Sequence, residues 1–203
     1  MKKIICMALI SVASFPVFAQ DRNGENGGGV FKKENLFTGG SVTASFFNGS
    51  TVLGVSPYFG YSLNKFIDLA VSLNFNYISQ RDFVEYGDKV RQTIFAPGAF
   101  ARLFPVRFLF GEAKFEHNFI RLKYIPAPNS FRTKDIRKVE ANSLLVGGGY
   151  TSGRYPGNNT YYYLTILWDM TRSANSPYVD NLGRSIPIIT AGYNIALFQG
   201  RHH

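Results

Sequence analysis

The residue types that could carry chemistry in this chain are few, and the most distinctive is one histidine. His117 is the only histidine outside the C-terminal pair, and imidazole is the side chain best suited to general acid or base work near neutral pH. A nucleophilic site would also need a serine and a carboxylate beside it. Position 119, which shares the face of His117 in an extended strand, is phenylalanine. No catalytic residue is assigned, and the chain is predicted not to be an enzyme.

Two further motifs and the single cysteine do not indicate a catalytic or binding site. Ser62 and Lys65 match the Ser-x-x-Lys spacing, but that motif activates serine at a helix start, and here it spans a predicted hairpin turn. The glycines at 147–149 lack the following helix that a phosphate-binding loop needs, and in a strand they favour close packing. Cys6 lies in a segment expected to be removed. Neither a metal nor another cofactor is predicted.

The first residues have the pattern of an export signal. Lys2 and Lys3 precede an apolar run that ends at Val17-Phe18-Ala19, a small-residue cleavage pattern. We therefore expect a signal peptide over 1–19, a flexible glycine-rich leader over 20–35, and one β-barrel domain over 36–203. No later window reaches the roughly 18–20 uninterrupted apolar residues of a spanning helix.

Alternation of apolar and polar residues predicts strands along the rest of the chain. The clearest case runs from Ile67 to Tyr77, where every second residue is apolar. Turn residues divide the pattern into about eight strands, with short turns on one rim and longer loops at 80–90, 121–141 and 171–186 on the other. The predicted fold is all-β: a closed antiparallel up-and-down barrel with the strands 36–47, 50–62, 66–79, 91–104, 107–120, 142–152, 160–170 and 187–198.

Which face points outward decides between a membrane barrel and a soluble one. In a soluble lipocalin-like barrel that binds an apolar ligand, the apolar face points inward; in a membrane barrel it points outward. The polar faces carry mainly Ser, Thr, Asn and Gly, which suit an interior better than a solvated surface. Aromatic residues gather near strand ends, as a girdle at a membrane interface would; they include Tyr58, Phe59, Tyr61, Phe66, Phe104, Phe108, Phe110, Tyr161, Tyr162 and Tyr163. These features favour the membrane barrel.

Charged residues on the polar faces are expected to pair inside the barrel. Eight strands leave an interior just wide enough for side chains, so a diffusion pore is not expected. Asp68 lies just after one short turn and Arg102 just before the next, on neighbouring strands, so the two are predicted to meet. An internal ion-pair plug is favoured over an ion or proton pathway. The lumen set is Asp68, Arg102, Glu112, Lys114, Glu116 and Asp169.

The segment 121–141 is the most basic of the long connections. On an outer rim its cations could contact lipopolysaccharide phosphates, although a merely solvated loop explains them equally well. Nucleic acid is not expected as a partner of an exported chain whose basic residues lack a helix to enter a groove. The residues expected to make the phosphate contacts are Arg132, Lys134, Arg137 and Lys138.

Several short motifs resemble the family of small eight-stranded outer-membrane β-barrel proteins. They are Phe59-Gly60-Tyr61-Ser62-Leu63, Ala101-Arg102-Leu103-Phe104, Ser176-Pro177-Tyr178 and Ala191-Gly192-Tyr193-Asn194-Ile195. The last, with Phe198 near the end, also resembles the signal read by the barrel-insertion machinery, although the chain runs on to His203.

The resemblance implies residence in the outer membrane of a Gram-negative bacterium, contact with its lipids, no shared enzymatic activity and a structural or loop-mediated role. A monomer is assumed. Lipid A-modifying enzymes use barrels of similar size, so lipid enzymology stays as an alternative.

Overall fold

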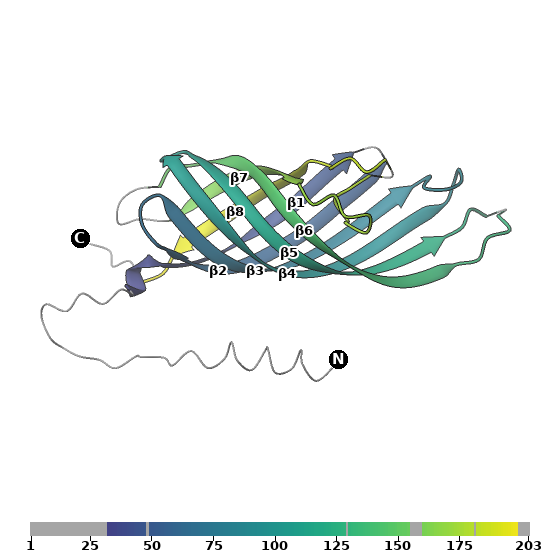
Figure 1. Ribbon diagram of the computed structural model, residues 1–203, viewed down its shortest axis with the longest axis horizontal. Coiled ribbons are helices and arrows are strands. Elements are labelled where there is room, and N and C mark those ends of the chain that lie inside the picture. Colours follow the sequence, from purple (N-terminus) through teal and green to yellow (C-terminus); the bar gives the residue numbers. More distant parts are fainter. Residues whose placement is uncertain (1–31, 48, 129, 155–159, 181, 199–203) are drawn as a thin grey trace, which may run out of the picture. The chain divides into compact units, whose positions relative to one another are not determined.

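Eight antiparallel strands form a closed ring in which each strand pairs with its sequence neighbours and β1 pairs with β8 (Figure 1). The computed structural model describes residues 32–47, 49–128, 130–154, 160–180 and 182–198; the predicted signal peptide and most of the predicted leader lie outside them. Lys33–Asn35 form one turn of 3-10 helix before the ring begins. The strands are β1 (Leu36–Phe47), β2 (Ser50–Ser62), β3 (Ile67–Arg81), β4 (Lys89–Val106), β5 (Leu109–Ile125), β6 (Asp135–Thr151), β7 (Tyr161–Asp169) and β8 (Ile188–Ala196). The predicted fold class is confirmed.

The two ends of the barrel differ. The end with the connections 63–66, 107–108 and 152–160 is called the turn end, and the end with the loops 82–88, 126–134 and 170–187 is called the loop end. Gly49 occupies the tight β1–β2 connection at the loop end with φ of 75°, a conformation that favours glycine. No helix among the described residues is long and apolar enough to cross a membrane.

One predicted loop is mostly strand. The segment 121–141 was expected to be a long connection, but β5 continues to Ile125 and β6 begins at Asp135. The predicted bounds are wrong because alternation between the two faces continues through the charged residues at both ends of this segment. As a result β3 to β6 are 15 to 18 residues long, while β7 and β8 have nine each.

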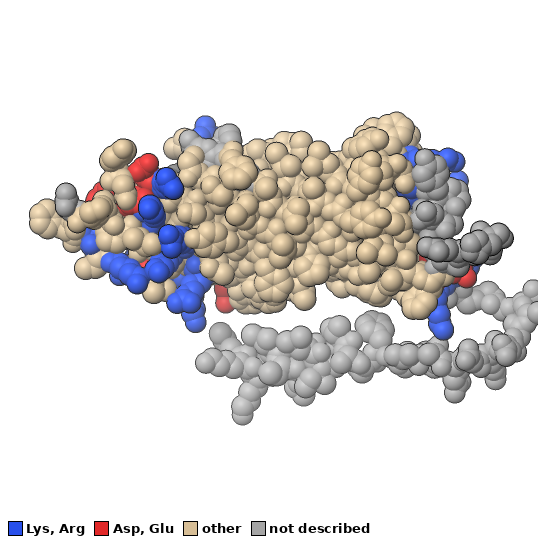
Figure 2. All heavy atoms as spheres, turned by 180° about the vertical axis from the view of Figure 1, so that it is seen from behind, with Lys and Arg blue, Asp and Glu red and all other residues tan. Residues whose placement is uncertain are grey.

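The apolar face of every strand points outward. On β3, Leu69, Val71 and Leu73 are 44%, 61% and 46% exposed, whereas Ser72 and Asn74 are 3% and 0% exposed. The same division holds around the ring, and Figure 2 shows a broad band without Lys, Arg, Asp or Glu between two charged ends. This is the reverse of the soluble lipocalin-like alternative, whose interior would be apolar.

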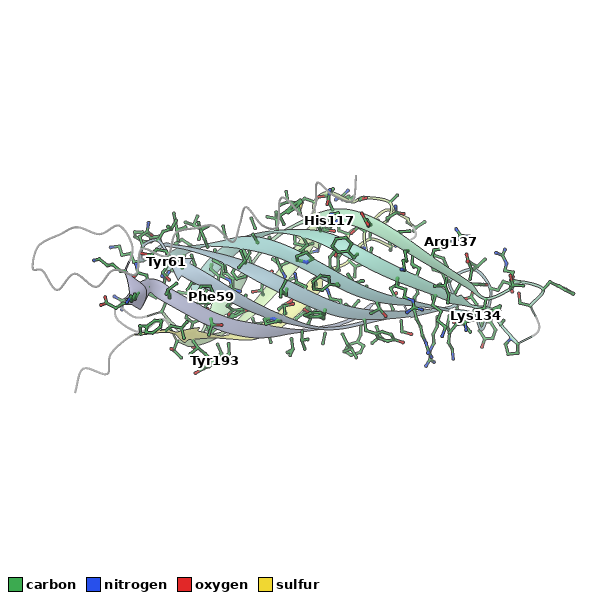
Figure 3. All side chains as sticks on the ribbon, turned by 90° about the horizontal axis from the view of Figure 1, so that it is seen from below. Phe59, Tyr61, His117, Lys134, Arg137 and Tyr193 are labelled. Atoms are coloured by element: carbon green, nitrogen blue, oxygen red, sulfur yellow. The ribbon has the colours of Figure 1, made fainter. Side chains whose placement is uncertain are left out.

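The aromatic residues near the turn end divide between two faces, which corrects the expectation that they form one outer girdle. Phe59, Phe66, Phe108 and Tyr162 are exposed on the outside, and Figure 3 shows Phe59, Tyr61 and Tyr193 at this end. Tyr61 lies half-buried on the same outward face as Phe59. The remaining five pack into one buried cluster, because consecutive residues on a strand point to opposite faces. That inner cluster contains Phe37, Tyr58, Ala70, Phe100, Phe104, Phe110, Tyr161 and Tyr163.

Glycines at 147–149 allow the backbones of β6 and β7 to approach closely. A Cβ added at Gly147 would overlap the carbonyl oxygen of Ile166, and one at Gly149 would overlap that of Leu164. These contacts support the packing interpretation of the three glycines over a phosphate-binding one.

Candidate functional site

A buried ion-pair group, here called the Arg102 cluster, lies inside the turn end. Arg102 Nε is 2.8 Å from Glu112 Oε2, and both side chains are at most 5% exposed. Arg154 Nη2 is 2.8 Å from Asp68 Oδ1, and its guanidinium also donates to the carbonyl oxygens of Asn64 and Lys65. Two buried acids are therefore matched by two buried bases, and Arg154 ties the β2–β3 turn to the segment after β6.

Four aromatic rings of the inner cluster surround the Arg102 guanidinium. Its central carbon lies 4.0 Å from the Tyr163 ring centroid and 4.6 Å from that of Phe100. The rings of Tyr58 and Phe110 lie at 5.5 and 5.1 Å. Such desolvated cation–π contacts favour the charged guanidinium where water is excluded. This arrangement holds the cation in one place and gives it one acidic partner.

The sequence predicts that Asp68 and Arg102 meet. The structure places the two residues as direct partners in the β3–β4 register. Arg102 is also the register partner of Glu112 on β5, and it forms its ion pair there. Asp68 pairs instead with Arg154, which sequence reasoning missed because it lies outside the strands, where alternation assigns no face.

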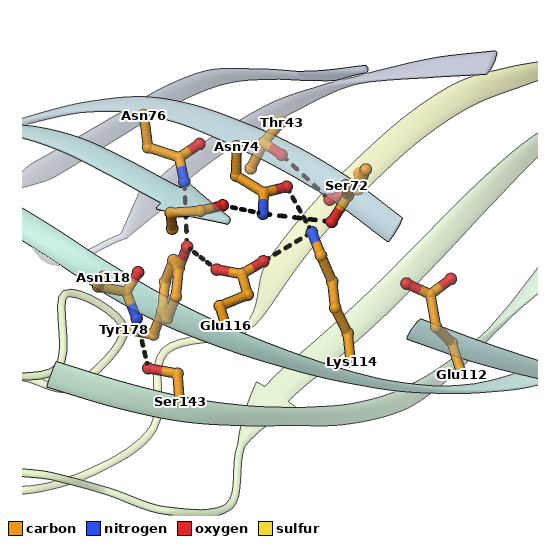
Figure 4. Close-up of polar contacts among 12 residues, drawn as sticks. Thr43, Ser72, Asn74, Asn76, Glu112, Lys114, Glu116, Asn118, Ser143 and Tyr178 are labelled. Atoms are coloured by element: carbon orange, nitrogen blue, oxygen red, sulfur yellow. Dashed lines mark hydrogen bonds and ion pairs between the residues drawn. The ribbon is translucent and has the colours of Figure 1, made fainter. Parts of the chain in front are cut away.

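A second polar group, the Glu116 network, occupies the interior toward the loop end (Figure 4). Lys114 Nζ lies 2.6 Å from Glu116 Oε1 and donates to Asn74 Oδ1 at 2.7 Å. The Tyr178 hydroxyl donates to Glu116 Oε2 at 2.8 Å and accepts from Asn76 Nδ2 at 3.0 Å. Strands β3 and β5 and the β7–β8 loop thus meet in a single hydrogen-bonded network.

Tyr178 reaches this network from the β7–β8 loop, which folds into the barrel. The residue is 3% exposed and packs with Leu145, Leu167 and Ile188. Ser176 of the same loop donates to Asp169, the sixth residue of the predicted lumen set. The sequence predicts this connection as one of three longer loops on the rim. Its segment 176–178 is buried, which the sequence did not indicate.

The four residues predicted to contact lipopolysaccharide are not equivalent. Arg132 pairs with Glu85 at 2.8 Å, and Arg137 pairs with Asp135. Lys134 and Lys138 form no ion pair with any described residue. Figure 3 shows Lys134 and Arg137 at the loop end. Arg137 and Lys138 belong to β6, so only two of the four lie on the loop itself.

His117 lies on the outer face and has an acidic neighbour that alternation alone did not reveal. Its Nδ1 is 2.6 Å from Asn142 Oδ1, and its Nε2 is 3.7 Å from Glu140 Oε2. The His117 and Phe119 rings contact edge to face. None of these partners is a hydroxyl, so the group lacks the nucleophile of an acyl-transfer site. The β5–β6 register, which pairs Phe119 with Glu140, would have identified this acidic neighbour of His117.

A buried carboxylate organises the β3–β4 loop outside the apolar band. Asp88 accepts the backbone N–H groups of Phe83, Val84 and Glu85 at 2.6–3.0 Å. Burial raises the pKa of Asp88, but the amide donors of Glu85, Val84 and Phe83 outweigh it and hold the pKa below the ordinary value of 3.8.

We expect the order of this loop to depend on the Asp88 charge. The pKa of Asp88 is lower in the folded loop than in the unfolded chain. The carboxylate therefore stabilises the loop when the pH is above the ordinary pKa of aspartate, and this stabilisation is lost as the pH falls through the pKa of the folded state. Hydrogen–deuterium exchange of 83–85, corrected for intrinsic rates, should rise in acid. Asp88→Asn should show the raised exchange already at pH 7. Equal protection in the two proteins at neutral pH would contradict the assignment.

Comparison with known proteins adds a structural likeness and no family. No family model matches the chain, and no curated protein matches it. Among solved structures, it is similar to the N-terminal β-barrel domain of Pseudomonas aeruginosa OprF. The likeness has 12% sequence identity and a TM-score of 0.44, and it covers 81% of this chain and 98% of that one. The fold assignment therefore rests on the closed ring of strands in this chain itself.

Proposed function

We propose that this protein is an integral outer-membrane β-barrel of a Gram-negative bacterium, with a structural or loop-mediated role and no enzymatic activity. One observation carries the proposal: apolar side chains cover the outside of the ring, while amides, hydroxyls and ion pairs lie inside among clusters of buried aromatic and aliphatic side chains. An exposed apolar band of this extent needs a hydrocarbon environment, and a closed barrel satisfies its backbone hydrogen bonds there. Outer-membrane lipids are the partners of this surface.

The interior contacts support a lumen that is closed to diffusion. The aromatic rings around Arg102 fill the turn end, and the Glu116 network with Tyr178 occupies the region toward the loop end. Buried charges in both groups have partners of opposite sign, as expected where solvent does not hydrate them. An internal plug therefore fits the contacts better than an ion or proton pathway.

Leu73→Arg tests whether the apolar band lies in hydrocarbon. Leu73 is in the middle of the outward row of β3 and is 46% exposed, so the substitution is sterically free. In lipid vesicles we expect a loss of about 2–4 kcal/mol in unfolding free energy, because a cation at the bilayer midplane is costly. Ser79→Arg, on the same face near the loop end, should cost about 0–1 kcal/mol.

Urea unfolding of the refolded proteins in vesicles would measure both values. Equal costs at positions 73 and 79 would overturn the membrane assignment. Membrane fractions give a second test: the barrel should resist carbonate extraction and migrate differently on a gel before and after boiling. Release of the protein into the soluble fraction would also reject the proposal.

A further inference from the structure

Basic residues are distributed unevenly around the barrel. Strands β1, β2, β7 and β8 contain no Lys or Arg. The longer strands β3 to β6 carry them, and near the loop end six lie on the outward face: Arg81, Lys89, Arg91, Arg121, Lys123 and Lys138. We call four of these residues the basic wall patch: Arg91 of β4, Arg121 and Lys123 of β5, and Lys138 of β6. Figure 2 shows Lys and Arg gathered at one end of the uncharged band.

The register places like charges of the patch directly opposite each other. Arg91 is the partner of Lys123, and Arg121 is the partner of Lys138. Like-charged cross-strand pairs destabilise a sheet. In the described part of the chain, none of the four forms an ion pair. The outward acid on these strands, Glu140, lies opposite Phe119 and faces His117 instead. Among the residues that the structure describes, no salt bridge neutralises the patch.

An aromatic strip adjoins the patch on the side of the apolar band. The rings of Phe75 and Phe95 are 5.2 Å apart, and those of Phe95 and Phe119 are 6.3 Å apart. Phe119 precedes Arg121 by two residues, which is roughly 7 Å along a strand. In a membrane, exposed aromatic rings mark the boundary between hydrocarbon and headgroups, and cations within this distance of them lie at the level of the headgroups.

We propose that the basic wall patch binds the phosphate groups of an outer-leaflet lipid headgroup, with the acyl chains of that lipid along Phe75, Phe95 and Phe119. The inference rests on the proposed membrane location and adds a site to it. Arginine forks bind phosphate oxygens in pairs, and lysines add charge at the same level. The site shares Lys138 with the predicted lipopolysaccharide contacts and adds Arg91, Arg121 and Lys123 of the strand wall. Two of the other predicted contacts, Arg132 and Arg137, already have acidic partners.

The test uses the full chain in phosphatidylcholine nanodiscs with bisphosphorylated lipid A as the probe. Retention of lipid A is measured by native mass spectrometry over a range of lipid A fractions. The patch variant carries R91Q, R121Q, K123Q and K138Q. Its matched control carries K32Q, K33Q, K65Q and R107Q, which remove the same charge from exposed positions at the turn end. Heat-modifiable migration shows that each variant is folded.

We expect the patch variant to retain lipid A roughly 100-fold more weakly, because each cation near an anionic headgroup contributes separately. The half-variants R91Q/K123Q and R121Q/K138Q should each weaken retention roughly tenfold. The turn-end control should bind like the wild type. Lipid A without phosphates should bind the wild type as weakly as intact lipid A binds the patch variant. Inorganic phosphate in millimolar excess should not displace the lipid.

Three results would overturn the inference: equal loss in the patch variant and the control, unchanged retention in both half-variants, or displacement by inorganic phosphate alone. Each of these leaves the membrane barrel intact. Failure of the wild-type chain to insert into any nanodisc would instead reject the proposed function, so the two failures are distinguishable.

Discussion

Replacing Arg102 with methionine is expected to lower the unfolding free energy by about 3–5 kcal/mol, because it leaves a buried carboxylate without its partner. That carboxylate is Glu112, 2.8 Å from Arg102 and 5% exposed. Asp68 should be little affected, since Arg154 remains beside it. Urea unfolding in vesicles, followed by the heat-dependent gel shift, would measure the loss. Arg107→Met, at an exposed position, should stay within about 0.5 kcal/mol of wild type.

A double substitution separates the ion pair from simple packing loss. R102M/E112Q removes both charges, and it should recover a large part of the stability because no bare carboxylate stays buried. If the double variant is as unstable as R102M alone, the aromatic contacts of the guanidinium would carry the effect instead. Wild-type stability of R102M would reject the pair altogether.

Tyr178→Ala is expected to release the β7–β8 loop from the barrel interior at a cost of about 3–5 kcal/mol, the range for deleting a buried aromatic ring. The ring packs with Leu145, Leu167 and Ile188, and the hydroxyl joins Glu116 to Asn76. Tyr178→Phe keeps the ring and should cost about 1–3 kcal/mol, the penalty for buried polar groups left without a partner.

Trypsin reports directly on this loop, because Arg172 and Arg184 lie at its two ends. Cleavage there should accelerate strongly in Y178A, moderately in Y178F and not at all in Tyr86→Ala, whose side chain is 94% exposed at the tip of another loop. Unchanged cleavage in Y178A would mean that Tyr178 does not hold the loop in place.

Strand positions and the direction of side chains could be predicted from the sequence because they depend on local periodicity. The strand 50–62 was predicted with its observed bounds, and all six charged residues assigned to the lumen point inward. Alternation also decided that Ser72 and Asn74 face one way and Leu73 the other. Period two is a property of extended backbone itself, so no long-range information was needed.

The choice of partners could not be predicted, because it depends on contacts between distant residues. Arg102 has an acid on each neighbouring strand, and it pairs with Glu112 while Arg154, from outside the strands, pairs with Asp68. Arg154 and Tyr178 lie outside the strands, so period two gives no direction for either. The basic strand ends at 121–125 and 135–141 were mistaken for loop because outward cations there resemble a solvated connection.

The uneven lengths of the strands determine where the ring is weakest. With nine residues each, β7 and β8 share far fewer hydrogen bonds with their neighbours than β4 does with its 18. A closed sheet has no edge strand until the backbone hydrogen bonds between two neighbouring strands break. Under force or heat the wall should therefore unzip first beside β7, and the β3–β6 half should remain as the last folded remnant of the molecule.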